Sequence, residues 1–272
     1  MPELPEVETV ARELRPHLVG RTIQSVWLDW PRALEPMLPE DFQNRIAGQK
    51  VELVGRRAKY VLVKLNADWL LIHLKMSGRL YIVANEAATD SDRWVHFNFQ
   101  LDNAHQLRFS DSRKFGRVIL TNDLKAVVGH LGPEPLDESF TVDILKERLS
   151  HRKTSLKPLL LNQEFIAGIG NIYADEALHR AHLHPLRRSD SLTENDISSL
   201  HEAIRWVLNK GIERSGASIG WYRQPNGEKG TMQDEFLAYG RAGHPCQTCG
   251  QGTIERIVVG QRSTHFCPQC QR

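Results

Sequence analysis

Residues 1–20 read MPELPEVETVARELRPHLVG and begin with two prolines set among acidic residues. After Pro5 the apolar residues recur at the three- and four-residue spacing of one helix face. Proline at a helix start lacks only an N–H group that would be unpaired there, and glutamate in the first turn suits the helix dipole. The stretch therefore predicts an amphipathic helix that ends near Pro16 and Gly20. Its apolar positions are Val7, Val10, Ala11, Leu14 and Leu18.

The same start can carry chemistry. Methionine before a small residue is normally trimmed in the cytosol, which would leave Pro2 with a free secondary amine. An α-amino group titrates near ~8, and the iminium that such an amine forms with carbon is a charged electron sink. Glu3 and Glu6 would lie beside it as acid or base. A simple helix start explains these residues equally well, so the catalytic interpretation needs support from the rest of the chain.

Size and composition are those of a folded, water-soluble protein. The 272 residues, 40% hydrophobic and 25% charged, suffice for one large domain or two ordinary ones. A net charge of +2 leans toward polyanions without deciding a partner, so any basic surface has to be local. We find no leader segment and no apolar run long enough for a bilayer, and we expect a cytosolic protein with no membrane partner.

All four cysteines lie in the last 27 residues, where short strands are expected. Cys246 and Cys249 form one Cys-x-x-Cys pair, and Cys267 and Cys270 form a second after a gap of 17 residues. Two such pairs facing each other across a hairpin make a tetrahedral four-thiolate zinc site. Four protein ligands leave no open position for substrate, so the single predicted zinc ion is structural.

The periodicity of the chain changes between these two ends. From Thr22 to about Leu120 apolar residues recur at every second position, most strictly in residues 95–101, which predicts a mostly β first part with a hairpin turn at Asp102-Asn103. Residues 131–137 contain two prolines and a glycine, which indicates a linker. Helical spacing follows, and Thr193 is the expected cap of the last helix. The expected helices are 142–149, 155–161, 171–181 and 193–214.

Three residues of the β-rich part are candidates for protruding side chains. Met76 continues an inward-facing strand pattern but precedes a turn, so it is either a core residue or a flexible apolar wedge. Arg113 and Phe115 lie in DSRKFG, residues 111–116, where a strand ends. Together the three would suit a protein that fills a hole left in a stack of bases, whereas a solvated hairpin tip would explain the last two without DNA.

Two further residues of this part carry titratable groups. Strand alternation places Lys59 on the apolar face of residues 59–65, where burial would lower its pKa and prepare it for proton transfer. A lysine at a strand end more often extends its ammonium group to solvent. His73 is expected on the face opposite to Leu70 and Ile72.

Residues 164–173, EFIAGIGNIY, resemble a phosphate-binding helix start. Two glycines free the backbone for a close approach, and we expect Asn171 to cap the helix that follows. Many helix caps look like this and bind nothing. Arg152, Lys153 and Lys157 add positive charge immediately upstream, which a simple turn does not need.

Taken together, these segments resemble the formamidopyrimidine-DNA glycosylase family, and the resemblance runs from one end of the chain to the other. The motifs that carry it occur in family order: PELPEVET, RRAKY, HLKMSG, DSRKFG, LGPEPL, GIGNIYADEAL, YGRAGHPC and the closing CPQCQ. The resemblance implies an α+β fold with an N-terminal β-sandwich and leading helix, a helix-two-turn-helix segment and a C-terminal zinc hairpin. The implied divisions are a catalytic domain 1–130, a linker 131–140, a helical domain 141–232 and a zinc-finger hairpin 233–272.

The resemblance also implies roles for individual residues. Pro2 looks like the nucleophile at C1′, Glu3 like the acid that assists sugar-ring opening, and Lys59 like a proton donor in strand cleavage. Arg262 matches the zinc-hairpin arginine linked to phosphate binding and elimination. The supporting candidates are Glu6 and Glu176 for catalysis, Asn171, Arg152, Lys153 and His73 for DNA contact, and Met76, Arg113 and Phe115 as the void-filling trio.

The chain departs from the family pattern in three places. Residues 91–94 read SDRW where the family often has a Lys-His pair, which makes Arg93 the candidate replacement. His265 stands where an aromatic residue is usual. Residues 215–229 align with the loop that covers the extruded base, so the exact lesion preference is not carried over.

We therefore predict a bifunctional DNA glycosylase and AP lyase of base excision repair. It would remove 8-oxoguanine and formamidopyrimidines from double-stranded DNA through an N-terminal proline Schiff base with β,δ-elimination. We expect a monomer in the bacterial cytoplasm, associated with the nucleoid. Two alternatives stay open: an endonuclease VIII-type glycosylase for oxidised pyrimidines, and a non-catalytic zinc-ribbon protein that recognises damaged DNA.

Overall fold

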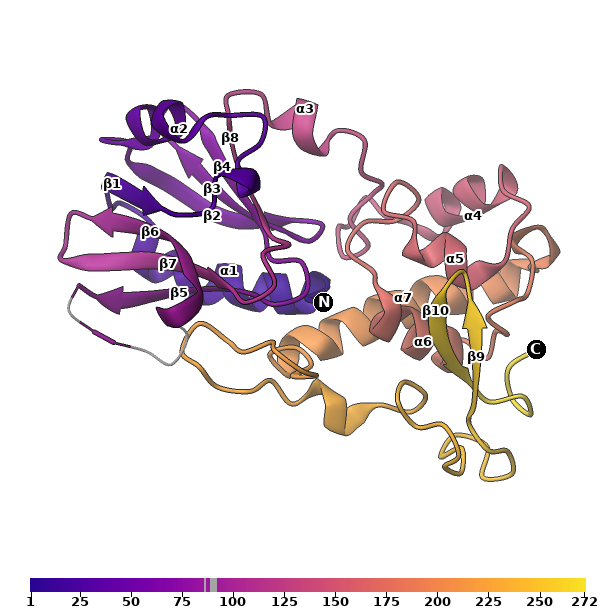
Figure 1. The fold of residues 1–272 in the computed structure, drawn as a ribbon. Helices are drawn as coiled ribbons and strands as arrows, with labels where there is room; N and C mark the ends of the chain where they lie inside the picture. The colour runs from indigo at the N-terminus through magenta and orange to yellow at the C-terminus, as the bar shows by residue number, and fades with distance from the viewer. Residues whose placement is uncertain (86, 89–91) are drawn as a thin grey trace. The chain divides into compact units, whose positions relative to one another are not determined.

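The computed structural model describes residues 1–85, 87–88 and 92–272. The chain divides into two compact units, whose elements are labelled in Figure 1. Unit 1 consists of Met1–His130 and Ser215–Gly230, and unit 2 of Leu131–Arg214 and Thr231–Arg272. The chain thus returns to unit 1 after it has formed the helices of unit 2. The four-part division implied by the sequence stays a prediction.

Unit 1 is built on two four-stranded antiparallel sheets. The first has the order β1-β6-β7-β5 and the second the order β2-β3-β4-β8. The first sheet contains β1 (Ile23–Leu28), β5 (Gly78–Ala84), β6 (Val95–Leu101) and β7 (His105–Asp111). The second contains β2 (Val51–Arg57), β3 (Tyr60–Leu65), β4 (Trp69–His73) and β8 (Arg117–Thr121).

One hydrophobic core joins the two sheets. Phe97 and Phe99 of β6 and Val63 of β3 belong to the same buried cluster, so the sheets pack face to face as a sandwich. The alternation in residues 95–101 is confirmed from Phe97 onward, where Phe97, Phe99 and Leu101 are buried and the intervening Asn98 and Gln100 are half-buried, whereas His96 is also buried. The expected turn follows, with Ala104 in the left-handed conformation (φ 58°) before β7 begins.

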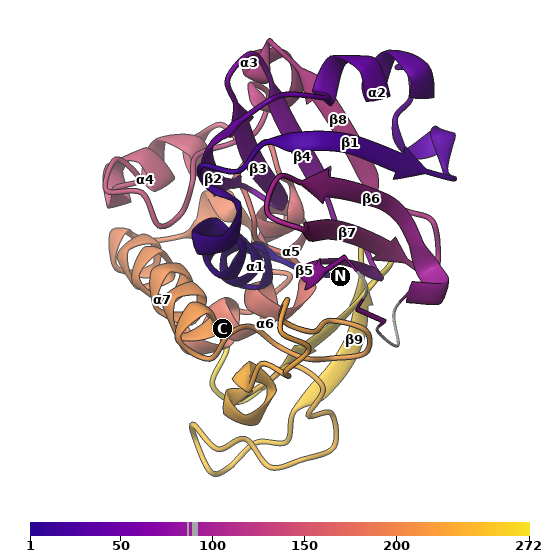
Figure 2. The same cartoon turned by 90° about the vertical axis from the view of Figure 1, so that its left-hand side faces the viewer.

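Among the described residues of unit 1, three α-helices accompany the sheets: α1 (Leu4–Leu18), α2 (Pro39–Ile46) and α3 (Leu124–Val128). The predicted leading helix is confirmed, and its last turn contains Pro16. α1 contacts β2 and β5, which are edge strands of the two sheets, and it closes that side of the sandwich (Figure 2). The sequence did not predict α2, whose buried residues Phe42 and Ile46 join the core.

Unit 2 contains four α-helices and a two-stranded hairpin. α6 contacts α5, α7 and the strand β10. Thr193 caps α7, because its hydroxyl accepts a hydrogen bond from the N–H of Asp196 (3.2 Å), as predicted. Each predicted helix is present within one residue of its expected bounds. The elements are α4 (Val142–Ser150), α5 (Leu156–Leu161), α6 (Asn171–Arg180), α7 (Glu194–Glu213), β9 (Glu255–Val259) and β10 (Arg262–Phe266). Short 3₁₀ turns lie in both units. Those of unit 1 are Pro31–Ala33 and Asp92–Trp94, and those of unit 2 are Ser189–Ser191 and Met232–Glu235.

Candidate functional site

The start of α1 holds the candidate nucleophile and acid. Pro2 and Glu3 lie directly before the helix and are buried, with Glu3 at the N-cap position. The N–H of Glu3 donates to Oε2 of Glu6 at 2.8 Å, the reciprocal bond of a capping box. Oε1 of Glu6 accepts a second bond from the N–H of Ala217 at 2.7 Å. Glu6 therefore connects the Pro2-Glu3 start to Ser215–Gly230, the segment in which the chain returns to unit 1 and which we call the returning segment.

The returning segment is shaped to receive Glu6. Gly216 has φ +80°, and a Cβ atom there would lie 2.8 Å from Cγ of Glu6, so glycine is required. The hydroxyl of Tyr222 lies 3.2 Å from the carbonyl oxygen of Ser215 and 3.4 Å from that of Glu6. Burial, together with the charge of Glu6, raises the pKa of Tyr222 far above its usual range, so this phenol stays a hydrogen-bond donor.

Lys59 lies in the turn between β2 and β3 and is 5% exposed. Its ammonium group therefore does not extend into bulk solvent. The carbonyl of Ala58 (φ 51°) accepts a hydrogen bond from Nη1 of Arg56 at 3.1 Å. Nε of Arg56 donates to Oε2 of Glu8 in α1, also at 3.1 Å. The Lys59 turn is thus tied to the helix that begins beside Pro2.

His73 is a buried neighbour of this turn. His73 of β4 is the cross-strand partner of Tyr60 in β3, and the two rings meet edge to face with their centres 4.8 Å apart. Burial, followed by the positive charges of Lys75 and Lys59, lowers the pKa of His73 to about 3. Its Nδ1 accepts a hydrogen bond from the N–H of Lys75 at 3.0 Å, as a neutral ring can. Little of this side chain is left for a DNA contact, and that role of His73 stays a prediction.

Met76, Arg113 and Phe115 lie together at the surface of unit 1. Met76 is 41% exposed and Phe115 is 48% exposed, and both line one depression of about 740 Å³. Met76 is therefore not a core residue. The guanidinium carbon of Arg113 lies 4.6 Å from the centre of the Phe115 ring, which keeps the two side chains stacked.

Two segments that depart from the family pattern, SDRW (residues 91–94) and residues 215–229, contact each other in unit 1 through Trp94 and Trp221. The guanidinium group of Arg93 lies over the Trp94 ring at 3.7 Å, and Trp94 meets Trp221 of the returning segment edge to face at 5.6 Å. Arg93 and Arg223 line a pocket of about 250 Å³ there. Ser91, the first residue of the divergent SDRW stretch, lies outside the described residues.

Asn171 does not cap α6, contrary to expectation. Gly170 occupies the cap position and Asn171 is the first helical residue. Nδ2 of Asn171 instead donates to the carbonyl oxygen of Ser263 in β10 at 2.9 Å. Among the described residues, its Oδ1 is a buried acceptor without a partner. The side chain faces the zinc hairpin because that bond holds it there.

Arg262 begins β10 directly beside Ser263 and is exposed. Gly260 (φ 55°) and Gln261 (φ 63°) form the two-residue turn before it, with Val259 paired to Arg262. Two successive left-handed residues give the type I′ turn that suits a tight hairpin. The structure thus brings Arg262 and Asn171 together within unit 2.

Arg152 and Lys153 are exposed in the loop between α4 and α5. The hydroxyl of Ser189 donates to the carbonyl oxygen of Arg152 at 2.8 Å and fixes the loop. Lys157, expected to add to this surface charge, is fully buried. It forms an ion pair with Asp175 and donates to the carbonyl oxygen of Asn171 at 2.9 Å. Its charge is neutralised in the interior, so that expectation was wrong.

Asp175 and Glu176 of α6 are structural anchors. Oδ2 of Asp175 accepts from the N–H and from Nδ1 of His265, at 2.9 and 3.1 Å, which fixes β10 on α6. His265 also meets Tyr239 edge to face at 5.1 Å and so fills the place of an aromatic residue. Glu176 accepts three backbone N–H groups, from Leu237, Ala238 and Tyr239 at 2.7–2.9 Å. Its suggested supporting role in catalysis stays a prediction.

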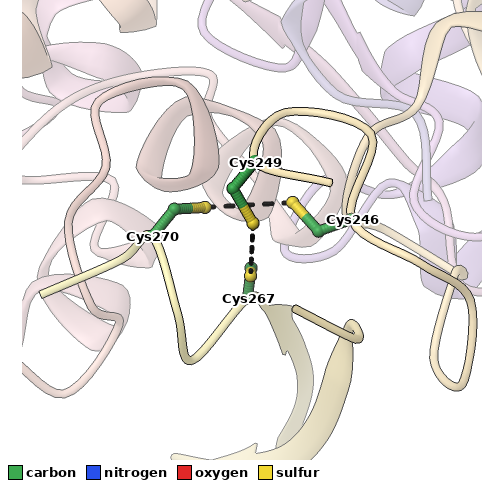
Figure 3. Close-up of side chains that lie close together, drawn as sticks. All are labelled: Cys246, Cys249, Cys267 and Cys270. Atoms are coloured by element: carbon green, nitrogen blue, oxygen red, sulfur yellow. Dashed lines mark hydrogen bonds between the residues drawn. The ribbon is translucent and has the colours of Figure 1, made fainter. Parts of the chain in front are cut away.

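The four cysteines point toward one centre (Figure 3). The sulfur atoms of Cys246 and Cys270 are 3.8 Å apart, those of Cys249 and Cys267 are 3.7 Å apart, and all four lie within 4.8 Å of one another. Zn–S bonds of about 2.3 Å in a tetrahedron place sulfur atoms about 3.8 Å apart, so the donor set fits zinc. Hydrogen bonds from the backbone of Gln251 and Gly252 lower the pKa of the Cys249 thiol to about 6, which favours a thiolate ligand.

The zinc knuckle is supported from α6. Nε2 of His179 lies 2.8 Å from Oγ1 of Thr248 and 3.9 Å from the sulfur of Cys246. A Cβ atom on Gly252 would lie 2.5 Å from the sulfur of Cys267, so only glycine fits there. These contacts orient the loops that carry the four ligands.

Comparisons with known proteins decide the family. Three family models match in order: the formamidopyrimidine-DNA glycosylase N-terminal domain over residues 1–118, its H2TH domain over 131–222, and the zinc finger found in FPG and IleRS over 243–272. The chain belongs to the formamidopyrimidine-DNA glycosylase family. The resemblance stated from the motifs is thereby confirmed, as are the α+β fold with its H2TH and zinc-finger parts and the single structural zinc site.

Relatives within this glycosylase family match over the whole chain. A formamidopyrimidine-DNA glycosylase of Chloroflexus aurantiacus is 53% identical, covering 100% of this chain and 98% of its own length. One of Herpetosiphon aurantiacus is 49% identical, with 100% of each chain covered. These names support a DNA-repair glycosylase of the formamidopyrimidine type over both alternatives weighed from the sequence.

Solved structures of the family have the same fold. A Lactococcus lactis FPG mutant in complex with Fapy-dG-containing DNA superimposes with a TM-score of 0.91 at 36% identity, with 100% of both chains covered. A complex of the Lactococcus lactis enzyme with abasic-site DNA gives a TM-score of 0.90 at 35% identity, with 99% of both chains covered. In the part of this chain that the structure describes, no helix is both long and apolar enough to cross a membrane.

Sequence reasoning missed two features of the site. The bond between Glu6 and Ala217 joins residues 211 positions apart, and no local pattern announces it. Tyr222 lies in the divergent stretch 215–229, for which the sequence predicted no core residue, yet it belongs to the core of unit 1. Its aromatic side chain beside Gly216 and Gly220 was the available signal that the loop packs inward.

Proposed function

We propose that this chain is a bifunctional DNA glycosylase and AP lyase of base excision repair that acts on oxidised purines in double-stranded DNA. The observation that carries the proposal is the buried Pro2-Glu3 start, held by Glu6 in a chain of this glycosylase family. The relatives solved with Fapy-dG and abasic-site DNA support the substrate class. An endonuclease VIII-type enzyme would instead prefer oxidised pyrimidines.

The chemistry begins once Met1 is removed. The lone pair of the Pro2 amine attacks C1′, and the bond between C1′ and the base breaks with its electrons passing to the base, which takes up the proton that the Pro2 nitrogen loses. Opening of the C1′–O4′ bond gives the iminium, with Glu3 as the acid that protonates O4′. The positive iminium acidifies the C2′ proton, whose loss expels the 3′ phosphate. A second elimination expels the 5′ phosphate, and Lys59 donates a proton during strand cleavage. Water then releases Pro2.

The remaining roles concern binding. We assign phosphate contacts to Asn171, Arg262, Arg152 and Lys153, because amide and cationic groups of this kind hold a DNA backbone. Met76, Arg113 and Phe115 fill the space that the damaged nucleotide leaves on rotating out, at an unstacking cost of a few kcal/mol. Arg262 also assists elimination. Zinc, when bound by the four cysteines, supplies only structure, because all its positions are taken.

The cellular setting is part of the proposal. The curated relatives named above are bacterial, which supports action in the bacterial cytoplasm on nucleoid DNA. We propose that the enzyme acts as a monomer. Light scattering of the complex with a lesion duplex should give one protein chain per duplex, and two chains would contradict this.

The decisive experiment traps the covalent intermediate. Met1-trimmed protein is incubated with an 8-oxoguanine duplex and borohydride, which reduces the iminium to a stable amine, and the adduct is located by mass spectrometry. We expect the adduct on Pro2, and the matched control protein that retains Met1 should form none. An adduct mapped to Lys59 alone would refute the assignment. Preference for a thymine glycol duplex would favour the pyrimidine enzyme, and an uncut abasic duplex the non-catalytic alternative.

A further inference from the structure

The two exposed loops that carry Met76, Arg113 and Phe115 share one buried support. Asp111 is the last residue of β7 and is fully buried. The proposed chemistry gives it no role. Its carboxylate nevertheless accepts hydrogen bonds from both loops.

Each oxygen of this carboxylate has its own set of donors. Oδ1 accepts from the hydroxyl of Ser77 and from the N–H of Arg113, the latter at 3.2 Å. Oδ2 accepts from the N–H groups of Phe115 at 2.9 Å and Gly116 at 2.8 Å. Two of the three exposed residues are thus bound to Asp111 through their own backbone.

The third is held through its neighbour. Met76 directly precedes Ser77, so the hydroxyl bond fixes the first loop beside Met76. Lys75 and Lys114, which precede Met76 and Phe115, both have left-handed backbone conformations (φ 51° and 54°). Non-glycine residues adopt that conformation at a cost, so other contacts have to hold each loop.

A second buried residue packs beneath both loops. Phe109 lies two positions before Asp111, on the same face of β7, and is fully buried. A Cβ atom on Gly78 would lie 2.9 Å from its ring, and one on Gly116 would lie 2.4 Å from it. The absence of side chains at these two glycines lets the loops approach the ring and the carboxylate closely.

We propose that Asp111 is a positioning residue that holds the Met76 loop and the Arg113–Phe115 loop as one preformed wedge. A gap in a base stack is filled only when the side chains of both loops enter it together. Loops ordered in advance lose less conformational freedom on binding than loops that must be ordered by the DNA. The inference rests on the proposed function, since it concerns extrusion of a damaged base.

Comparing two substrates isolates this role. Excision of 8-oxoguanine requires the base to leave the stack, whereas an abasic site has no base to extrude. A loosened wedge should therefore slow base excision more than it slows cleavage at a preformed abasic site. A general loss of folded protein would lower both rates by the same factor.

The experiment measures single-turnover rates of Met1-trimmed protein on an 8-oxoguanine duplex and on the matching abasic duplex. We expect Asp111→Ala to lower the ratio of excision to abasic cleavage about tenfold or more, which corresponds to about 1.4 kcal/mol. Asp111→Asn should give an intermediate ratio. Its carbonyl oxygen still accepts from Phe115 and Gly116 and its amide still donates to Ser77, so only the bond from Arg113 is lost.

The control is Asp68→Asn, which alters another buried carboxylate of unit 1, one bound by Arg45 and Gln49. We expect it to lower stability without changing the ratio. An unchanged ratio in Asp111→Ala, or an equal fall in Asp68→Asn, overturns the inference. If Asp111→Ala does not fold, Ser77→Ala and Asp111→Asn decide the matter by the same ratio. A wild-type protein that cuts neither duplex refutes the proposed function instead.

Discussion

Replacement of Glu6 by glutamine tests how firmly the returning segment of unit 1 is tied to the start of α1. Glu6 is buried, and each of its carboxylate oxygens accepts one backbone N–H, from Glu3 at 2.8 Å and from Ala217 at 2.7 Å. Glutamine has the same shape but one acceptor oxygen, so in either orientation one N–H faces another donor. A buried donor left without an acceptor costs about 1–3 kcal/mol, and loss of a charge-assisted bond belongs at the upper end.

We therefore expect Glu6→Gln to lower the free energy of unfolding by about 2–3 kcal/mol, measured by urea denaturation. The corresponding fall in Tm is about 4–12 °C. Limited proteolysis within residues 215–230 should become faster, because the bond from Ala217 is the one most easily released.

Glu13→Gln is the matched control on the same helix. Glu13 is partly exposed and accepts one long bond from the N–H of Asn226, at 3.4 Å. We expect a change of less than about 0.5 kcal/mol there. Equal effects of the two substitutions, or an unchanged rate of loop cleavage in Glu6→Gln, would refute the reasoning about Glu6.

Three further outcomes are expected. Chelation should release one zinc ion per chain, measured with a colorimetric indicator. It should also abolish binding to a lesion duplex, because the hairpin depends on its four cysteines. Binding that survives complete release of zinc would count against this. Arg262→Ala should reduce the slope of the logarithm of the binding constant against the logarithm of the salt concentration by about 1, whereas Arg262→Lys should retain the wild-type slope. Equal slopes for Arg262→Ala and the wild type would exclude a phosphate contact. The pKa of His73 falls from 6.5 to about 3 on folding, so the unfolded chain binds a proton more readily than the folded one. The contribution of His73 to stability is therefore present above pH 6.5 and is lost as the pH falls toward 3. Wild-type protein should lose about 2 kcal/mol between pH 7 and 5 from this group, and His73→Gln should show a correspondingly weaker pH dependence in urea unfolding.

The regular elements could be predicted because their signals are local. The spacing of apolar residues and the Thr193 cap fixed the last helix within one residue at each end. Strict alternation fixed β6, and the spacing of the cysteine pairs fixed the zinc ligands. Each of these signals lies within a few residues of what it specifies.

The failures concern interactions with distant partners. Lys157 and the exposed Arg152 are both basic residues near one helix start, and only the position of Asp175 reveals that Lys157 is buried. Asn171 has the composition of a helix cap, but a strand 92 residues further along the chain accepts its amide. The helix α2 was missed because it spans 8 residues and buries two of them, too few for helical spacing to be recognised.

The return of residues 215–230 to unit 1 constrains the order in which the protein can be completed. Tyr222 belongs to the core of unit 1, yet the ribosome makes it only after all four helices of unit 2. A nascent chain that ends at His130 would lack both this core side chain and the second partner of Glu6. Separate expression of the two halves would therefore require residues 215–230 to be supplied with the first half, as an added peptide or in a permuted gene.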